Sequence, residues 1–132
     1  MENNYKINKQ YYPENSHSII TITVIPEQKN VNQFLNGDFS RIKEVREWFL
    51  NGFKTMLDGE YKEPITMEGD EVELKIGKET TTIRFTLHEN LNVPLECFMD
   101  INEELEDTID TKKLYGIMLE WGSRQQNAEI PR

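Results

Sequence analysis

Hydrophobic and polar residues alternate along three stretches of the chain. Isoleucine and valine alternate with threonine over residues 18–25, and a similar alternation recurs over 71–76 and 81–88. The apolar positions of the last two stretches are Val72, Leu74, Ile76, Ile83, Phe85 and Leu87. A period of two is typical of a strand with one buried face, so each stretch is a predicted strand. A shorter strand is predicted over residues 64–67.

The second and third of these stretches form a predicted hairpin, and its register depends on the loop between them. A two-residue loop places Leu74 opposite Thr81, whereas a four-residue loop over 77–80 places Leu74 opposite Ile83. Because apolar side chains that face each other across two strands stabilise a sheet, we expect the longer loop.

Apolar residues at a helical period lie between the first strand and the hairpin. A short helix is predicted over residues 28–36, with Val31, Phe34 and Leu35 on one face. A longer helix follows, with an N-cap at Asp38 or Ser40 and an end at Asp58. Gly52 inside it indicates the close approach of another element. The apolar stripe of this helix contains Ile42, Val45, Trp48, Phe49, Phe53, Met56 and Leu57.

Two segments in the last third of the chain fit more than one pattern. Residues 94–101 fit a helix capped by Asn92, or a strand that leads to a helix capped by Asp100. Both alternatives place residues 100–110 in a helix. Residues 113–121 fit either a helix or a strand. The helix would bury Leu114, Ile117, Met118 and Trp121, and the strand Tyr115, Ile117, Leu119 and Trp121.

The order of these elements predicts the fold class. A chain of 132 residues is long enough to bury a core as one domain, over residues 1–132. Its polar ends, residues 1–16 and 122–132, are expected to be loosely ordered. We predict an α+β fold, with a small, mainly antiparallel sheet and a central hairpin. The sheet is expected to pack against a long helix and one or two C-terminal helices.

Charge is distributed unevenly along the chain. The net charge is −9, yet residues 1–58 carry seven basic and seven acidic side chains, which cancel. Residues 59–132 carry eight basic and seventeen acidic side chains, so 8 − 17 gives the whole excess. An acidic surface disfavours direct binding of nucleic acid, whose affinity comes largely from phosphate neutralisation. It favours a basic protein partner, because complementary charge accelerates encounter.

The acidic residues concentrate over residues 89–111, which contain eight of them and no lysine or arginine. Apolar side chains lie between them and are expected to hold the segment on the core, namely Leu95, Phe98, Met99 and Leu105. The segment is therefore the predicted partner-binding site, although a charge run is often only a solvated helix face. The candidate residues are Glu96, Asp100, Glu103, Glu104, Glu106, Asp107 and Asp110.

No catalytic, cofactor-binding or metal-binding residues are predicted. Cys97, His17 and His88 do not have the spacing of zinc ligands. Residues 100–111 match part of a calcium loop, but Leu105 stands where the turn needs glycine and Thr111 where a bidentate glutamate is needed. Cys97 is expected to be a buried structural thiol, because no cation lies near it in the sequence. His88 is expected to be a surface imidazole, and Trp48 and Trp121 are expected in the core.

Three features of the sequence bear on the compartment of the protein and on whether it enters a membrane. A single cysteine cannot form an internal disulfide, the first residues lack the apolar region of a signal peptide, and no stretch is long enough to span a membrane. We therefore expect a cytoplasmic protein that does not enter the membrane. The sequence indicates no oligomeric state.

In length, acidity and fold type the chain resembles the small immunity proteins of bacterial toxin–immunity systems, including those of contact-dependent inhibition and polymorphic toxins. The acidic residues over Glu96–Asp110 and the lack of a catalytic set carry this resemblance. It implies a non-enzymatic protein that occludes the active site of a cationic, nuclease-type toxin. No shared motif transfers a role to any residue. The alternatives are an adaptor or regulatory domain with another partner, and a small-molecule enzyme with a pocket around His88 or Cys97.

Overall fold

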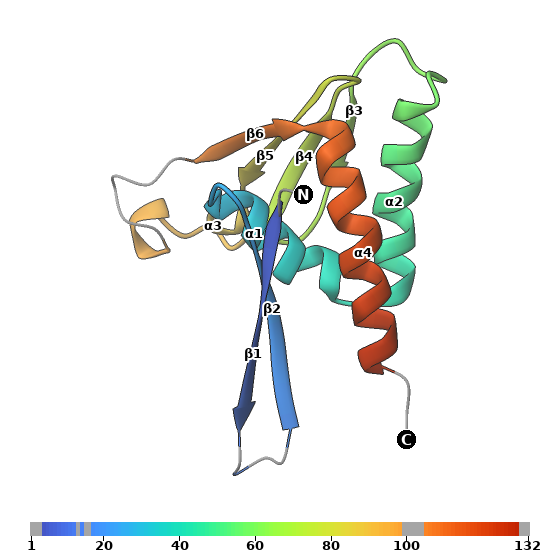
Figure 1. Cartoon of the computed structure of the whole chain (residues 1–132). Coiled ribbons are helices and arrows are strands. Elements are labelled where there is room, and N and C mark those ends of the chain that lie inside the picture. The colour runs from blue at the N-terminus through green and yellow to red at the C-terminus, as the bar shows by residue number, and fades with distance from the viewer. Residues whose placement is uncertain (1–3, 13, 15–16, 99–104, 130–132) are drawn as a thin grey trace.

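The structure is a computed structural model that describes residues 4–12, 14, 17–98 and 105–129. It contains a two-stranded and a four-stranded antiparallel sheet with helices, which confirms the predicted α+β class (Figure 1). In chain order the elements are β1 (Tyr5–Tyr12), β2 (His17–Val24), α1 (Lys29–Asn36), η2 (Asp38–Ser40), α2 (Lys43–Leu57), β3 (Ile65–Glu68), β4 (Val72–Ile76), β5 (Thr80–Phe85), α3 (Leu87–Asn90), η3 (Leu95–Cys97), β6 (Glu106–Asp110) and α4 (Thr111–Glu129).

The four-stranded sheet has the strand order β3-β4-β5-β6, and every neighbouring pair is antiparallel. Leu74 lies opposite Ile83, which is the register that the longer hairpin loop predicts. Burial alternates along β4 and β5, so one face of the sheet is buried and the other faces solvent. The predicted strands over 64–67, 71–76 and 81–88 are thus confirmed, except that the last ends at Phe85.

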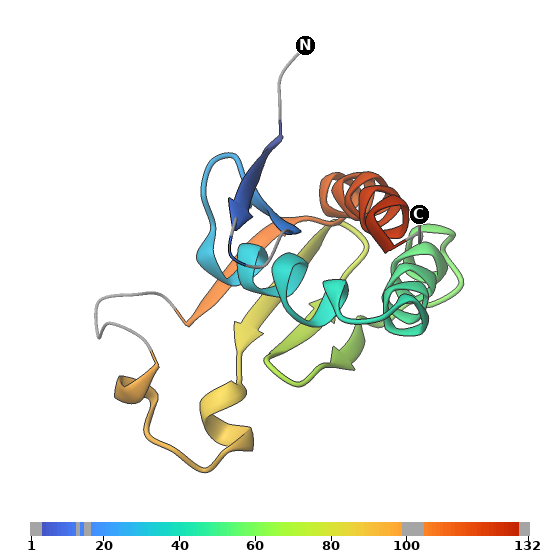
Figure 2. The same cartoon turned by 90° about the horizontal axis from the view of Figure 1, so that it is seen from below.

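Helices α1, α2 and α4 pack on the buried face of this sheet. Figure 2 shows α2 and α4 side by side, and the two helices contact each other along their length. Trp121 of α4 is fully buried, and its indole N–H donates to the carbonyl oxygen of Leu35 at 2.8 Å and to Ser40 Oγ at 3.0 Å. A Cβ atom at Gly52 would clash with Met67 Sδ of β3, which confirms the predicted close approach of another element to α2.

The N-terminal hairpin of β1 and β2 projects away from the larger sheet (Figure 1). Strand β2 was predicted, but β1 was not, because residues 1–16 were expected to be a loosely ordered end. The β1 sequence is mostly polar because only one of its faces turns to the protein, where Tyr5 and Ile7 pack against the core. Burial next to Glu120 of α4 raises the pKa of the Tyr5 hydroxyl.

The predicted helix over residues 100–110 is wrong for residues 106–110, which form the edge strand β6. Ile109 turns inward and is buried, whereas the acidic side chains at both ends of β6 are exposed. Residues 99–104 lie outside the described residues, and with them the proposed cap at Asp100. Among the two alternatives for 113–121 the structure has the helix. Helix α4 buries Leu114, Ile117, Met118 and Trp121 and extends through residues 122–129, which were not predicted to be helical.

The long helix α2 begins later than the predicted caps imply. Its N-cap position is Ile42, whose side chain makes no capping hydrogen bond. Asp38 and Ser40 belong instead to the separate short helix η2. Among the described residues, no helix combines the length and the apolar character needed to cross a membrane.

Candidate functional site

The solvent-facing side of the four-stranded sheet carries two of the predicted acidic residues, Glu106 and Asp110, together with further charged side chains. The helices pack on its opposite side. We call this surface the outer sheet face. It consists of the outward side chains Thr66, Glu68, Glu73, Lys75, Thr80, Thr82, Arg84, Glu106, Thr108 and Asp110, all of which are exposed or half-buried.

One row of side chains crosses all four strands of the outer sheet face. Glu68 lies opposite Glu73, Glu73 opposite Arg84, and Arg84 opposite Glu106. Like charges directly opposite each other on neighbouring strands destabilise a sheet, so the Glu68–Glu73 pair is unfavourable for the isolated fold. Three carboxylates and one guanidinium leave this acidic row with a net negative charge.

The single cation of this acidic row is already engaged. Arg84 Nε lies 3.7 Å from Glu73 Oε1, and Arg84 Nη1 donates to Glu89 Oε2 at 2.8 Å. The hydrogen bond from Arg84 lowers the pKa of the Glu89 carboxyl, so Glu89 stays ionised to a lower pH than an ordinary glutamate. Because two carboxylates share this guanidinium, it does not offset the acids at Glu68 and Glu106.

The predicted partner-binding residues separate into three groups. Glu106 and Asp110 are exposed on the outer sheet face, and Glu96 is exposed on η3. Asp100, Glu103 and Glu104 lie outside the described residues. Asp107 turns to the buried side, where its Oδ2 accepts the N–H of Asn30 at 2.6 Å and that of Val31 at 3.3 Å.

Two of these acids therefore hold helix N-termini. Asp107 binds free amides of the first turn of α1, and Asp110 Oδ2 accepts the N–H of Lys113 at 2.8 Å in the first turn of α4. The loss of either carboxylate would affect the fold. The fully outward Glu106 thus remains the clearest described candidate of the predicted set on this sheet.

Other expectations for the acidic segment need correction. Phe98 is 38% and Leu105 44% exposed, so neither is buried in the core as expected. Cys97 is exposed rather than a buried thiol. His88 lies in α3, where its ring stacks on Phe85 with centroids 5.9 Å apart and its Nδ1 is buried without a hydrogen-bond partner. His88 is therefore part of a small aromatic cluster and not a surface imidazole at a strand end.

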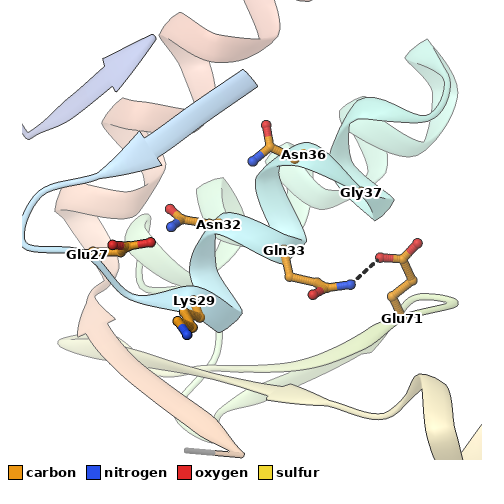
Figure 3. A pocket seen from close by; sticks show the side chains of 7 residues that line it. All are labelled: Glu27, Lys29, Asn32, Gln33, Asn36, Gly37 and Glu71. Carbon is orange, nitrogen blue, oxygen red and sulfur yellow. Dashed lines mark hydrogen bonds between the residues drawn. The ribbon is translucent and has the colours of Figure 1, made fainter. Parts of the chain in front are cut away.

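A shallow polar cavity of about 480 Å³ lies beside α1 (Figure 3). The amide of Asn36 accepts the N–H of Ile22 and donates to its carbonyl, both at 2.9 Å. Asn32 Oδ1 accepts the N–H of Val24 at 2.8 Å, and Gln33 donates to Glu71 at 2.9 Å. The polar groups that line this cavity therefore hold β2 and the β3–β4 turn to α1, which indicates a structural role. Its lining residues are Glu27, Lys29, Asn32, Gln33, Asn36, Gly37 and Glu71.

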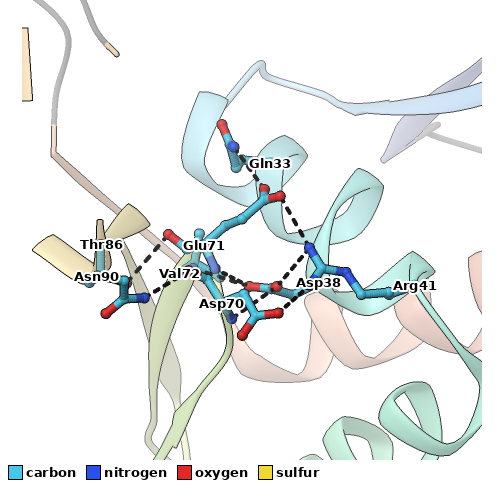
Figure 4. A network of polar contacts seen from close by, with 8 residues as sticks. All are labelled: Gln33, Asp38, Arg41, Asp70, Glu71, Val72, Thr86 and Asn90. Carbon is cyan, nitrogen blue, oxygen red and sulfur yellow. Dashed lines mark hydrogen bonds and ion pairs between the residues drawn. The ribbon is translucent and has the colours of Figure 1, made fainter. Parts of the chain in front are cut away.

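A polar network around Asp38 joins the β3–β4 turn to η2 (Figure 4). The Asp38 side chain is 3% exposed and accepts the backbone N–H groups of Asp70, Glu71 and Val72 at 2.9–3.1 Å. Arg41 forms ion pairs with Asp38, Asp70 and Glu71. A buried carboxylate satisfied by three donors is stable, so this network fixes the end of the sheet. It was missed from the sequence, where Asp38 was assigned to the cap of α2.

A second surface lies where α2 meets the edge strand β3. A cavity of about 500 Å³ opens here, and we call it the aromatic groove. Trp48 is 49% and Tyr61 57% exposed, so the prediction that Trp48 lies in the core is wrong. The apolar stripe of α2 is wider than the face that the sheet covers, and Trp48 lies at its uncovered margin. The groove is lined by Trp48, Asn51, Gly52, Thr55, Tyr61, Glu63, Pro64, Ile65, Thr66 and Met67.

Within the described part of the chain, no group of three or more histidine, cysteine, aspartate or glutamate side chains could hold a metal ion. No protein-family model, curated protein or solved structure matches the chain. The two candidate sites are therefore the outer sheet face and the aromatic groove beside it.

Proposed function

We propose that this protein is a non-enzymatic, cytoplasmic binding domain that captures a basic protein on its outer sheet face. The observation that carries the proposal is the acidic row, in which Glu68, Glu73 and Glu106 outnumber the one cation, Arg84, across the four-stranded sheet. Evolution of a stable fold alone gives no reason to place Glu68 opposite Glu73, because this arrangement costs stability. A cationic partner would turn that cost into a favourable contact.

The resemblance to immunity proteins suggests which basic protein this is. A nuclease-type toxin uses lysine and arginine to bind phosphate, and those side chains are complementary to the acidic row. Docking would neutralise them and block access of the substrate. The long-range attraction between the two surfaces would accelerate encounter, and apolar contacts would supply the lifetime of the complex.

A second candidate function is that of an adaptor whose partner docks on an open sheet edge. The strand order leaves β3 with a strand neighbour on one side only, and the aromatic groove lies next to it. Such an edge can accept an extended segment of another protein. The adaptor function differs from capture on the outer sheet face in the source of the affinity. Affinity would come from backbone hydrogen bonds at the β3 edge and from the aromatic side chains of the groove.

Capture with paired baits tests the proposal. The wild-type protein and a triple variant, Glu68→Lys, Glu73→Lys and Glu106→Lys, are immobilised and compared by quantitative mass spectrometry. We expect a basic protein that binds the wild type and is lost from the variant. A control with Glu14→Lys and Glu44→Lys, both exposed and outside the outer sheet face, should retain it. Equal capture by all three baits would contradict the proposal.

A further inference from the structure

The strand edges of this protein differ in how they are covered. On β6, the side-chain amide of Gln28 donates to the carbonyl oxygen of Thr108 at 2.8 Å. On β2, the side chains of Asn32 and Asn36 bind the backbone at Val24 and Ile22. Side-chain amides thus occupy these two edges. Strand β3 is the other end of the four-stranded sheet, and the aromatic groove opens beside it.

The register identifies which backbone groups of β3 point outward. The N–H of Gly69 donates to the carbonyl oxygen of Val72 at 2.9 Å and closes the β3–β4 turn. Hydrogen-bonded and non-hydrogen-bonded pairs alternate along an antiparallel ladder. Met67 therefore bonds with β4, whereas Thr66 and Glu68 direct their N–H and C=O groups away from it. These two residues present the spacing that one additional strand requires.

The aromatic groove supplies contacts for the side chains of such a strand. Trp48 and Tyr61 line it and are about half exposed, at 49% and 57%. Partly exposed tryptophan and tyrosine side chains beside a groove are the residue types that dominate binding energy in protein interfaces. Strand addition commonly combines backbone hydrogen bonds with pockets for alternate side chains.

Charge indicates the chemistry of the occupant. Residues 47–68 carry five acidic and two basic side chains, a net charge of −3 from 2 − 5. One of the two lysines, Lys54, is paired with Asp58 at 3.1 Å. A cationic segment is complementary to this surface, whereas a second copy of a chain with net charge −9 would be repelled.

We infer that an extended, cationic segment of the partner adds to β3 as a further strand and seats an apolar side chain in the aromatic groove. The inference rests on the proposed function, because it takes the partner to be a basic protein. It extends the outer sheet face across its β3 edge, so that one partner contacts both surfaces.

Titration of the isotope-labelled full chain with a short synthetic peptide tests this inference. The peptide alternates lysine and valine and is blocked at both ends. We expect amide shifts at Thr66 and Glu68 and a shift of the Trp48 indole N–H. Thr66→Pro removes one outward N–H and should raise the dissociation constant of the peptide at least about tenfold. Thr66→Val keeps the N–H and should bind the peptide as the wild type does. Trp48→Ala should weaken binding by a similar factor.

A second peptide tests strand addition on the wild-type protein, so the result does not depend on whether the Thr66→Pro variant folds. Methylation of alternate backbone nitrogens in the peptide removes its donors and leaves the protein unchanged, and it should abolish the shifts at Thr66 and Glu68. Undiminished binding of the methylated peptide would overturn strand addition. Shifts confined to Glu73 and Glu106 would overturn the inference and leave the proposed function standing. A peptide that shifts no residue would overturn both.

Discussion

Glu68 on β3 and Glu73 on β4 lie directly opposite each other on the exposed face of the sheet. Two carboxylates in this position repel, and the guanidinium of Arg84, which lies opposite Glu73 on β5, forms its ion pair with Glu73 and its hydrogen bond with Glu89. The fold therefore tolerates an unfavourable pair at the β3 edge of the surface that we propose for docking. A substitution that removes this repulsion should raise the stability of the fold and weaken binding of a basic partner, so the two effects can be measured separately.

The change Glu68→Lys places opposite charges on β3 and β4. We expect it to raise the free energy of unfolding by about 0.2–1 kcal/mol, because it replaces a like-charge pair by an ion pair. The same change should weaken capture of a basic partner. Urea denaturation and the bait experiment provide the two measurements. A variant that is more stable and binds the partner as well as the wild type would identify the row as a solvated surface only.

Asp38 is expected to be among the most important polar side chains for stability. Asp38→Ala removes a buried carboxylate that accepts three backbone N–H groups, and it should lower the free energy of unfolding by about 3–5 kcal/mol. Asp38→Asn keeps one acceptor oxygen and should cost less. The control Asp58→Ala removes only an exposed partner of Lys54 and should leave the unfolding midpoint nearly unchanged. Equal midpoints for Asp38→Ala and the control would refute this role.

Asn36 of α1 is expected to protect the backbone of β2 at the strand edge that faces α1. Asn36→Ala frees both backbone groups of Ile22, so the amide of Ile22 should exchange with solvent faster. Asn36→Asp keeps the acceptor for the N–H of Ile22 but cannot donate to its carbonyl, and it should retain most of the protection. Hydrogen exchange followed by NMR measures both. Unchanged exchange at Ile22 in Asn36→Ala would show that this bond does not limit opening of the hairpin.

The Arg84–Glu89 contact is expected to make the stability of the fold depend on pH. The hydrogen bond from Arg84 lowers the pKa of Glu89 in the folded state. Its contribution to stability is therefore fully present above the ordinary glutamate pKa of about 4.3, and it is lost as the pH falls through the lower, folded value. Carboxyl NMR titration should place Glu89 below that ordinary value, and Arg84→Gln should return it. A titration midpoint of Glu89 that Arg84→Gln leaves in place would contradict this assignment.

Sequence patterns predicted the strands and helices that have one apolar face toward the core and one polar face toward solvent. The register of β4 and β5 followed from the pairing of Leu74 with Ile83. Strands β1 and β6 were missed because each is polar and forms by pairing with a partner strand, so its own sequence holds little of the signal. The acidic residues over 100–110 were assigned to a helix, yet Asp107 and Asp110 of β6 accept hydrogen bonds from the first-turn amides of other elements, α1 and α4.

The candidate site was predicted only in part. Its charge and the residues Glu106 and Asp110 came from the sequence, since acid content is visible without a fold. Glu68 and Glu73 joined them only through the register of four strands, which no local pattern contains. Trp48 was assigned to the core because hydrophobicity alone does not show how much of a helix face its neighbours cover.

The salt dependence of association with the captured partner tests the central proposal most directly. Association rate constants are measured for the wild type and the Glu68→Lys, Glu73→Lys, Glu106→Lys variant from about 0.05 to 0.5 M NaCl, where the screening length falls about threefold. We predict a wild-type rate at least about tenfold higher at low salt, and convergence of the two proteins at high salt. Equal rates with equal salt dependence would contradict docking on the outer sheet face.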